Sequence, residues 1–235
     1  MTASEQGKAP VVTVDGPSGT GKGTLSTLLA RELGWHFLDS GALYRAVALA
    51  ARKGGIPLEV ERANELGELA RGLAVRFEPT PEGPVRTLLD GEDVSRELRS
   101  GETSEGASVV ASMQPVRERL LDLQRSFRVA PGLVADGRDM GTVVFPDAPC
   151  KVFLTATPEE RARRRYEQLR GQGSDVTLER IREELHQRDE RDTQRKVAPL
   201  RPSEGAYVID TTDISVEEVL AAAQAWVRQC YPERT

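Results

Sequence analysis

The residues with the clearest chemical potential lie at 11–24, where VVTVDGPSGTGKGT runs from apolar residues into glycines and ends on a lysine, a glycine and a threonine. Glycines let a backbone turn tightly and bring its N–H groups to phosphate oxygens, and a helix starting near Lys22 adds the positive end of its dipole. Lys22 would offset the charge of a transferring γ-phosphoryl group. We therefore predict an ATP-binding phosphate loop made of Gly16, Pro17, Ser18, Gly19, Thr20, Gly21, Lys22, Gly23 and Thr24.

The loop departs from its usual pattern at one position. Ser or Thr normally follows the lysine directly, but here Gly23 takes that position and Thr24 comes one residue later. The shift disfavours most motor proteins, GTPases and ABC-type subunits, and the sequence has neither an Asn-Lys-x-Asp run nor an LSGGQ-like signature. Small-molecule kinases remain. We expect Mg²⁺ as the cofactor, with Thr24 and Asp136 as candidate ligands, directly or through water.

A second anion site is expected where HFLDSGALYR, residues 36–45, passes from a strand into a helix. Ser40 would cap that helix, whose N-terminus attracts anions, and Arg45 would lie near it. The segment ADGRDMGTVVFPDAP would place Arg138 and Asp139 beyond a strand, where open α/β sheets bind ligands. A structural interpretation stays open for both segments: helix capping with a surface arginine in the first, and an Arg–Asp ion pair in the second.

The elements that must position these residues alternate between strands and helices. Apolar, β-branched runs predict strands at 11–15, 35–41, 132–137, 151–156 and 207–211, all but the second of them buried. Helical periodicity separates them, as at 22–33, and recurs at 215–230. We therefore predict an α/β fold, a doubly wound parallel sheet of five strands with helices on both faces.

Two segments stand apart from this alternation. Strand-like stretches at 74–79 and 85–91 flank the turn-rich TPEGP (80–84), which predicts a hairpin in a small antiparallel lobe. The charged segment 157–195 predicts two helices around GQGSD, either a solvated hairpin or an arm that closes and excludes water. The spacing does not decide which arginines of its first helix point inward; the candidates are Arg161, Arg163, Arg164 and Arg165.

Composition narrows the class of protein. A chain of 235 residues can bury one substantial core, and a net charge of −5 argues against a basic nucleic-acid scaffold. No apolar run approaches the roughly 18 residues that span a membrane. We expect a soluble, cytoplasmic monomer whose partners are small-molecule nucleotides, with neither nucleic acid nor membrane. The cysteines (Cys150, Cys230) form no metal-like or disulfide-like pattern, and the histidines (His36, His186) have no catalytic partner motif.

Four motifs carry a resemblance that covers nearly the whole chain, from about Val11 to Tyr231: GPSGTGKGT, LDSGALYRAVAL, DGRDMGTVVFPDA and RDERDTQRKVAPL. Together they are similar to the motifs of bacterial cytidylate kinases, which phosphorylate CMP and dCMP with ATP. The resemblance implies a single kinase domain, 1–235, with a nucleoside-monophosphate kinase fold. Its core would comprise 10–63, 107–156 and 196–235, its monophosphate-binding insert 64–106, and its helical lid 157–195.

The same resemblance implies roles for individual residues. The residues around the CMP phosphate would be Ser40, Arg45, Arg138 and Arg195. Those reading cytosine would be Ser108, Arg117 and Asp139, and those near the sugar Arg188 and Asp192. A carboxylate suits the base site, because cytosine offers an amino donor where uracil has a carbonyl oxygen. We expect catalysis to depend on Lys22, Arg138, Arg188 and Arg195.

Two alternatives remain at this level. One is another small-molecule kinase with a phosphate loop, acting on uridylate, shikimate or a different monophosphate. The other is a regulatory or RNA-associated module that hydrolyses ATP without an acceptor, although the acidic charge and the lack of an aromatic stacking cluster disfavour RNA.

Overall fold

A computed structural model of the chain describes residues 8–80, 85–171, 173, 175–195 and 197–233. Of the turn predicted at 80–84, only Thr80 is among these residues. The strands are β1 (Val11–Asp15), β2 (His36–Asp39), β3 (Val75–Glu78), β4 (Arg86–Leu89), β5 (Glu92–Asp93), β6 (Leu133–Gly137), β7 (Cys150–Thr155) and β8 (Tyr207–Asp210). The helices are α1 (Lys22–Leu33), α2 (Ser40–Lys53), α3 (Ala63–Gly72), α4 (Gly101–Val110), α5 (Gln114–Ser126), α6 (Pro158–Gly171), α7 (Leu178–Gln194) and α8 (Val216–Cys230).

Five strands form a parallel sheet in the order β2-β6-β1-β7-β8, which confirms the predicted α/β fold. β1, β6 and most of β7 are buried, as expected for apolar strands covered on both faces. β8 is different, because Tyr207 is 40% and Val208 50% exposed. The prediction of a buried strand at 207–211 is therefore wrong. β8 is an edge strand, and its Tyr207 ring packs on Trp226 of α8 with the ring centroids 5.5 Å apart.

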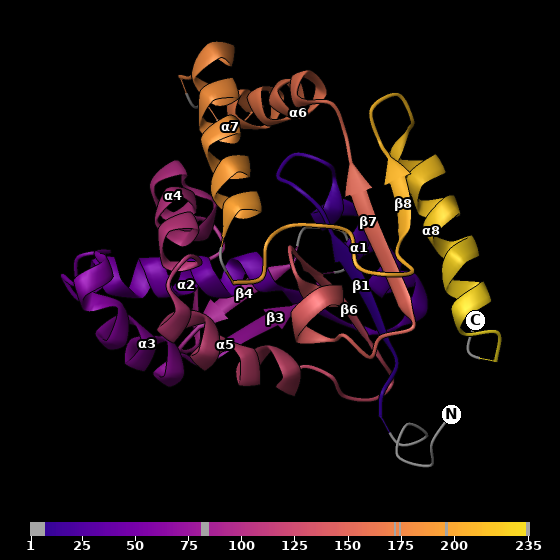
Figure 1. Cartoon of the computed structure of the whole chain (residues 1–235), viewed down its shortest axis with the longest axis horizontal. Helices are drawn as coiled ribbons and strands as arrows, with labels where there is room; N and C mark the ends of the chain where they lie inside the picture. Colours follow the sequence, from indigo (N-terminus) through magenta and orange to yellow (C-terminus); the bar gives the residue numbers. More distant parts are fainter. Residues whose placement is uncertain (1–7, 81–84, 172, 174, 196, 234–235) are drawn as a thin grey trace. The chain divides into compact units, whose positions relative to one another are not determined.

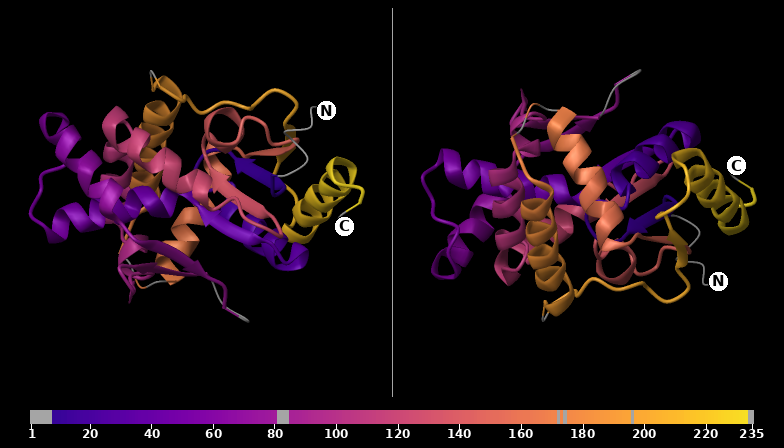
Figure 2. Two further views of the ribbon diagram at one scale, coloured as in Figure 1. Left: turned by 90° about the horizontal axis from the view of Figure 1, so that it is seen from below. Right: turned by 90° about the horizontal axis from the view of Figure 1, so that it is seen from above.

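The chain divides into two compact units, and unit 2 comprises residues 11–34 and 136–235. Within it β1 pairs with β7, with Val12 opposite Cys150, and β7 pairs with β8. Helix α8 runs beside β8 and contacts β7 (Figure 1). Helices α1 and α8 lie side by side in both views of Figure 2 and contact each other. Helices α1 and α8 thus pack together against β1 and β7.

The two helices predicted in 157–195 are α6 and α7, which follow β7 in unit 2. They pack against each other through Ala162, Leu169 and Ile181, with partly buried apolar side chains around this small cluster. Thr177 caps α7 by accepting the N–H of Arg180. This helical pair therefore has an apolar core of its own.

Unit 1 comprises residues 1–10 and 35–135. In it α2 packs on α4 and α3 packs on α5. The predicted hairpin is confirmed as the antiparallel pair β3–β4. β5 adds a third strand to this pair, which the sequence did not predict because β5 is only two residues long. The ring of Phe77 on β3 contacts those of Phe37 and Phe127, which ties the small sheet to the rest of unit 1.

Candidate active site

The loop between β1 and α1 is shaped by close backbone contacts in unit 2. Gly16 has φ 145°, and a Cβ there would lie 2.1 Å from the carbonyl oxygen of Leu154 on β7. Gly19 has φ 82°, and its Cβ would lie 2.9 Å from that of Arg161. Both positions therefore require glycine. The loop ends at Lys22, the first residue of α1, so the helix N-terminus faces the position expected for phosphate oxygens.

Lys22 is buried, with only 6% of its surface exposed, and its Nζ donates to the carbonyl oxygen of Pro17 at 2.7 Å. Burial lowers the pKa of Lys22 to about 7, and the nearby Arg138 guanidinium acts in the same direction. The carboxylate of Asp136 opposes this shift. An anion at the loop would favour the charged amine, since an opposite charge stabilises the ionised form.

Asp15 at the end of β1 has a structural role that the sequence did not reveal. Its two carboxyl oxygens accept the backbone N–H groups of Met140 and Gly141, both at 2.8 Å. Burial raises the pKa of Asp15 to about 7, although these two hydrogen bonds act to lower it. The carboxyl therefore fixes the backbone directly after Asp139 against β1.

Arg138 joins the phosphate loop to helix α7. Its Nη2 donates to the Ser18 hydroxyl at 2.7 Å, and its Nε donates to the Asp192 carboxylate at 2.9 Å. Burial acts to raise the pKa of Asp192, but the charges of Arg138, Arg188 and Arg195 outweigh it and hold that pKa below its usual value. Unit 2 thus brings together three of the predicted CMP-binding arginines around one buried carboxylate.

The remaining predicted residues of unit 2 lie near this cluster or near the loop. Asp136 is 8% exposed, and its Oδ2 is 3.6 Å from the position that a Cβ on Gly23 would take. Thr24 is exposed on the first turn of α1. Asp139 is 3% exposed, and its carbonyl oxygen accepts the N–H groups of Val143 and Val144 at 2.9 and 3.1 Å. Among the described residues, no group of three or more His, Cys, Asp or Glu is placed to hold a metal ion.

The structure decides which first-helix arginines of the charged segment point inward. Arg161 is 6% exposed, donates to the Ser18 carbonyl oxygen at 3.2 Å, and pairs with Asp189 of α7 at 2.6 Å. Arg164, one turn later, donates to the hydroxyl and the carbonyl oxygen of Thr211. Arg163 is instead exposed and pairs with Glu160 and Glu167 of its own helix. Spacing alone could not have selected this pair, because Arg161 shares a helix face with Arg165 at i, i+4 as well as with Arg164 at i, i+3.

In unit 1 the residue that caps α2 is Asp39, so the prediction that Ser40 caps it is wrong. Asp39 Oδ1 accepts the N–H of Ala42 at 2.8 Å, because Ser40 is already the first residue of the helix. Ser40 donates its hydroxyl to Gln124 of α5 at 2.7 Å. Arg45 pairs with the other oxygen of Asp39 at 2.6 Å, so it does lie beside the helix N-terminus.

The two base-reading candidates of unit 1 are both buried. Arg117 on α5 donates to the carbonyl oxygen of Ala111 at 3.3 Å, and its guanidinium lies 5.8 Å from the ring centroid of Tyr44. Ser108 on α4 is 6% exposed, and within the described part of the chain its hydroxyl has no hydrogen-bond partner. A buried hydroxyl left unpaired is costly.

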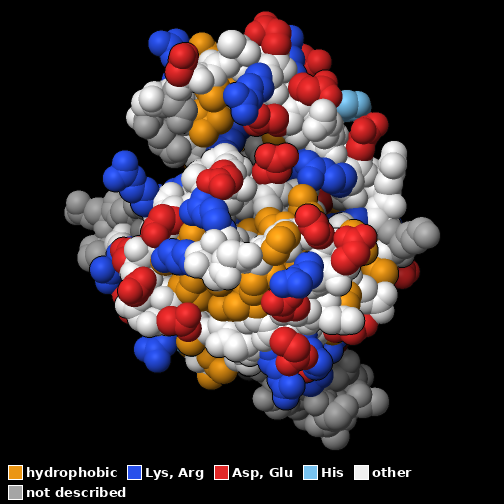
Figure 3. Space-filling view, turned by 90° about the vertical axis from the view of Figure 1, so that its left-hand side faces the viewer, with side chains coloured by type: hydrophobic (Ala, Val, Ile, Leu, Met, Phe, Trp, Pro, Cys, Tyr) orange, Lys and Arg blue, Asp and Glu red, His pale blue; other side chains and the backbone are white. Residues whose placement is uncertain are grey.

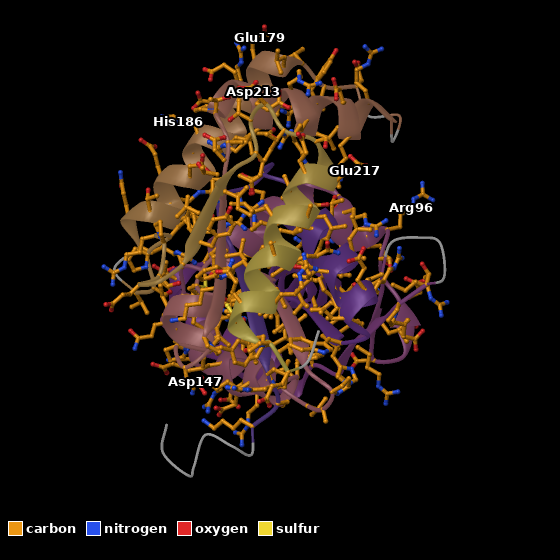
Figure 4. The ribbon with its side chains drawn as sticks, turned by 90° about the vertical axis from the view of Figure 1, so that its right-hand side faces the viewer. Arg96, Asp147, Glu179, His186, Asp213 and Glu217 are labelled. Atoms are coloured by element: carbon orange, nitrogen blue, oxygen red, sulfur yellow. The ribbon has the colours of Figure 1, made fainter. Side chains whose placement is uncertain are left out.

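Both histidines are exposed. His186 is exposed on α7, 3.6 Å from Glu190, and is labelled on that helix in Figure 4. His36 is exposed at the start of β2, where its Nε2 is 2.9 Å from the Ala130 carbonyl oxygen. The polar groups around the loop are instead arginines, a lysine and carboxylates, which suit phosphate chemistry.

Comparison with known proteins identifies the family of this chain. The family model described as cytidylate kinase matches residues 12–229. The chain belongs to the cytidylate kinase family. The cytidylate kinase of Pseudomonas savastanoi pv. phaseolicola is 58% identical over 214 residues, which are 91% of this chain and 93% of that protein. The cytidylate kinase of Aeromonas hydrophila subsp. hydrophila is 55% identical over 221 residues, 94% of this chain and 95% of that protein.

Family membership confirms the resemblance of the four motifs and makes the protein an enzyme, a phosphotransferase that phosphorylates cytidylate. Among solved structures, that of an uncharacterized protein from Eubacterium ventriosum has a TM-score of 0.51 at 11% identity. It covers 94% of this chain and 99% of that one, a likeness of fold alone. Cytidylate kinase chemistry thus accounts for a loop that suits ATP.

Proposed function

We propose that the protein transfers the γ-phosphoryl group of ATP to CMP or dCMP, giving ADP with CDP or dCDP, in pyrimidine nucleotide metabolism. The match of the cytidylate kinase family to residues 12–229 carries this proposal. The acceptor is a phosphate, which is already an anion at neutral pH. The enzyme therefore needs to position two anions and offset their charge, and no general base is required.

The ATP phosphates would be bound by the backbone N–H groups of residues 16–24 and by Lys22. Lys22 donates to a loop carbonyl, Pro17 O, at 2.7 Å. Exchange of that oxygen for a phosphate oxygen would return the amine to its charged form. Lys22 would then stabilise the charge that develops on the γ-phosphoryl group.

Four residues between positions 40 and 117 would bind the CMP phosphate and base. Ser40 and Arg45 would hold the phosphate, and Arg117 and Ser108 would donate to cytosine. Two unsatisfied donors support this assignment: within the described residues, the buried Nε of Arg45 and the hydroxyl of Ser108 lack hydrogen-bond partners. Hydrogen bonds to CMP would satisfy both.

Five further residues have roles in this proposal. We assign Arg138 and Arg195 to the CMP phosphate, Asp139 to the N4 amino group of cytosine, and Arg188 and Asp192 to the sugar. Arg138 and Arg188 would also stabilise the transferring group, together with Lys22 and Arg195. The pairing of Arg138 with Asp192 supports an exchange of hydrogen bonds when CMP binds. The Arg138 guanidinium would then bind the CMP phosphate, and the Asp192 carboxylate would accept a hydrogen bond from a sugar hydroxyl.

Mg²⁺ would be held by the Thr24 hydroxyl and the Asp136 carboxylate, directly or through water. These oxygens fit a hard cation, which usually binds through one or two carboxylates, substrate phosphates and water. Asp136 lies close to Gly23, beside Thr24, which supports the pairing of these two ligands. The chemistry that Mg²⁺ supplies there is neutralisation of phosphate oxygens.

We further propose that the chain is one kinase domain, divided into a core, an insert and a lid as the resemblance implies. Residues 10–63, 107–156 and 196–235 would form the core, 64–106 the monophosphate-binding insert, and 157–195 a lid. The ion pair of Arg161 with Asp189 keeps α6 and α7 together as one body, which suits a lid that moves as a unit and excludes water.

We propose that the enzyme acts as a monomer in the cytoplasm on free nucleotides, without nucleic acid or membrane. None of the helices among the described residues has the length and apolar content needed to cross a bilayer. Lys and Arg side chains alternate with Asp and Glu over the face in Figure 3, a mixed pattern that suits small anionic substrates better than a nucleic-acid backbone.

The test is ADP release in a coupled assay with CMP, dCMP, UMP, AMP or no acceptor. CMP and dCMP should be turned over at least about tenfold more efficiently than UMP, because a hydrogen-bonded base site rejects the analogue that leaves its groups mispaired. A preference for UMP or AMP would contradict the proposal. Equal ADP release without any monophosphate would instead identify an ATPase.

A further inference from the structure

The two cysteines of the chain meet in unit 2, although they lie far apart in the sequence. Cys150 begins β7 and is fully buried, while Cys230 ends α8 and is partly exposed. Cys230 Sγ is 3.7 Å from the carbonyl oxygen of Pro149, the residue before Cys150, and the two thiols lie close enough for a hydrogen bond between them to shift both pKa values. The two sulfurs are therefore neighbours in the reduced chain.

The backbone on both sides keeps these sulfurs together. Next to Cys230, the Tyr231 hydroxyl donates to the Val11 carbonyl oxygen at 2.9 Å and accepts the Val11 N–H at 3.1 Å. Val11 begins β1, which pairs with β7 one residue further on, at Val12 and Cys150. The C-terminal end of α8 is thus fixed against the amino ends of β1 and β7, toward the C label in Figure 1.

We propose that Cys150 and Cys230 form a reversible dithiol–disulfide pair, oxidised by peroxide, that fastens the end of α8 to the start of β7. The proposal concerns a part of unit 2 away from the phosphate loop and does not depend on the residue roles assigned above. Thiols become disulfides readily when one is reactive and accessible and the second is poised beside it.

The two thiols have different parts in this reaction. The hydrogen bond from Cys150 lowers the pKa of Cys230, whereas donating that bond and burial raise the pKa of Cys150. The Cys230 thiolate attacks hydrogen peroxide; an S–O bond forms, the O–O bond breaks, and the hydroxide that leaves takes up the proton released by the Cys230 thiol to give one water. The Cys150 sulfur then attacks the sulfenic acid; the S–S bond forms, the S–O bond breaks, and the Cys150 proton leaves with hydroxide as a second water.

The disulfide should stabilise the fold without blocking catalysis. The phosphate loop contacts β7 at Leu154, near the carboxyl end of the strand, whereas Cys150 is its first residue. At about 3.3 Å per residue these positions are roughly 13 Å apart. The bond would close a long loop of the chain, which removes conformational entropy from the unfolded state.

The experiment treats the reduced full-length chain with hydrogen peroxide and then removes the excess. We expect titratable thiols in denaturant to fall from two to none per chain, and the mass to fall by two hydrogens. A peptide joining Cys150 to Cys230 should appear on digestion, and dithiothreitol should restore both thiols. The melting temperature should rise by about 5 °C or more on oxidation, with kcat for CMP unchanged.

The matched control is Cys230→Ser, a change at the partly exposed position. It should keep the reduced melting temperature and show no rise after peroxide. The peptide map of the unaltered chain decides the matter even if this variant folds poorly. Separate sulfinic acids, disulfides between chains, or a joined peptide without any rise in melting temperature would each overturn the proposal.

Discussion

Asp15→Asn tests how strongly the buried carboxyl at the end of β1 couples stability to pH. Burial raises the pKa of Asp15 from 3.8 to about 7. Between these values the folded chain keeps a proton on Asp15 while the unfolded chain does not, so stability falls as the pH rises through this window. At 1.36 kcal/mol per pH unit, the loss between pH 5 and pH 7 is about 3 kcal/mol. Above pH 7 both states are ionised and the contribution is constant.

Asparagine cannot ionise, so the variant should lack this fall. It also offers one acceptor oxygen to the N–H groups of Met140 and Gly141, and leaving one of them unpaired costs about 1–3 kcal/mol. The stability advantage of the unaltered chain should therefore shrink by about 3 kcal/mol from pH 5 to pH 8.

The assay is urea unfolding followed by circular dichroism at pH 5, 6, 7 and 8. Asp213→Asn, at an exposed carboxyl of unit 2 labelled in Figure 4, is the control. Its free energy of unfolding should change with pH in parallel with that of the unaltered chain. If the free energy of unfolding of Asp15→Asn also stays parallel to that of the unaltered chain from pH 5 to pH 8, Asp15 is ionised in the folded chain throughout, and the reasoning is refuted.

Three further predictions concern the kinase reaction. Because burial lowers the pKa of Lys22 to about 7, kcat/KM for ATP should fall about tenfold per pH unit above pH 7. The value of kcat, which reports the ATP-bound enzyme, should stay constant to higher pH. A fall of kcat and kcat/KM over the same pH range would contradict this. Asp139→Asn should lower kcat/KM for CMP by about 10²-fold or more and reduce the preference for CMP over UMP, and an unchanged ratio would remove Asp139 from base recognition. Arg161→Met should leave Asp189 without its ion pair and lower the melting temperature by several degrees, whereas Arg163→Met, an exposed change on the same helix, should leave it nearly unaltered; equal effects would argue against the inward contacts of Arg161.

The sequence was most informative where local chemistry dictates structure. The glycines of the phosphate loop predicted a bend that ends on Lys22, and α1 begins at that residue. The apolar runs predicted the strands, since a strand covered on both faces leaves a continuous apolar signature. β8 was placed correctly but was expected to be buried, because apolar residues on an edge strand look the same in sequence as those on a central one.

The parts that the sequence did not predict depend on long-range neighbours. Asp15 read as the end of a strand, and only the structure shows it accepting N–H groups from residues more than a hundred positions away. The contact between Cys150 and Cys230 likewise follows from the packing of α8 on β7. The choice of Asp39 rather than Ser40 as the helix cap was a local matter, but both residue types cap helices well, and a shift of one residue decides between them.

The contact between Gly16 and Leu154 limits how this enzyme can adapt. Any side chain at position 16 would collide with a main-chain oxygen, 2.1 Å from the first added carbon, and substitution of Leu154 would not remove that oxygen. An inhibitor designed to lie against this bend would therefore meet a surface that point mutation cannot readily reshape, and resistance would have to arise at other positions.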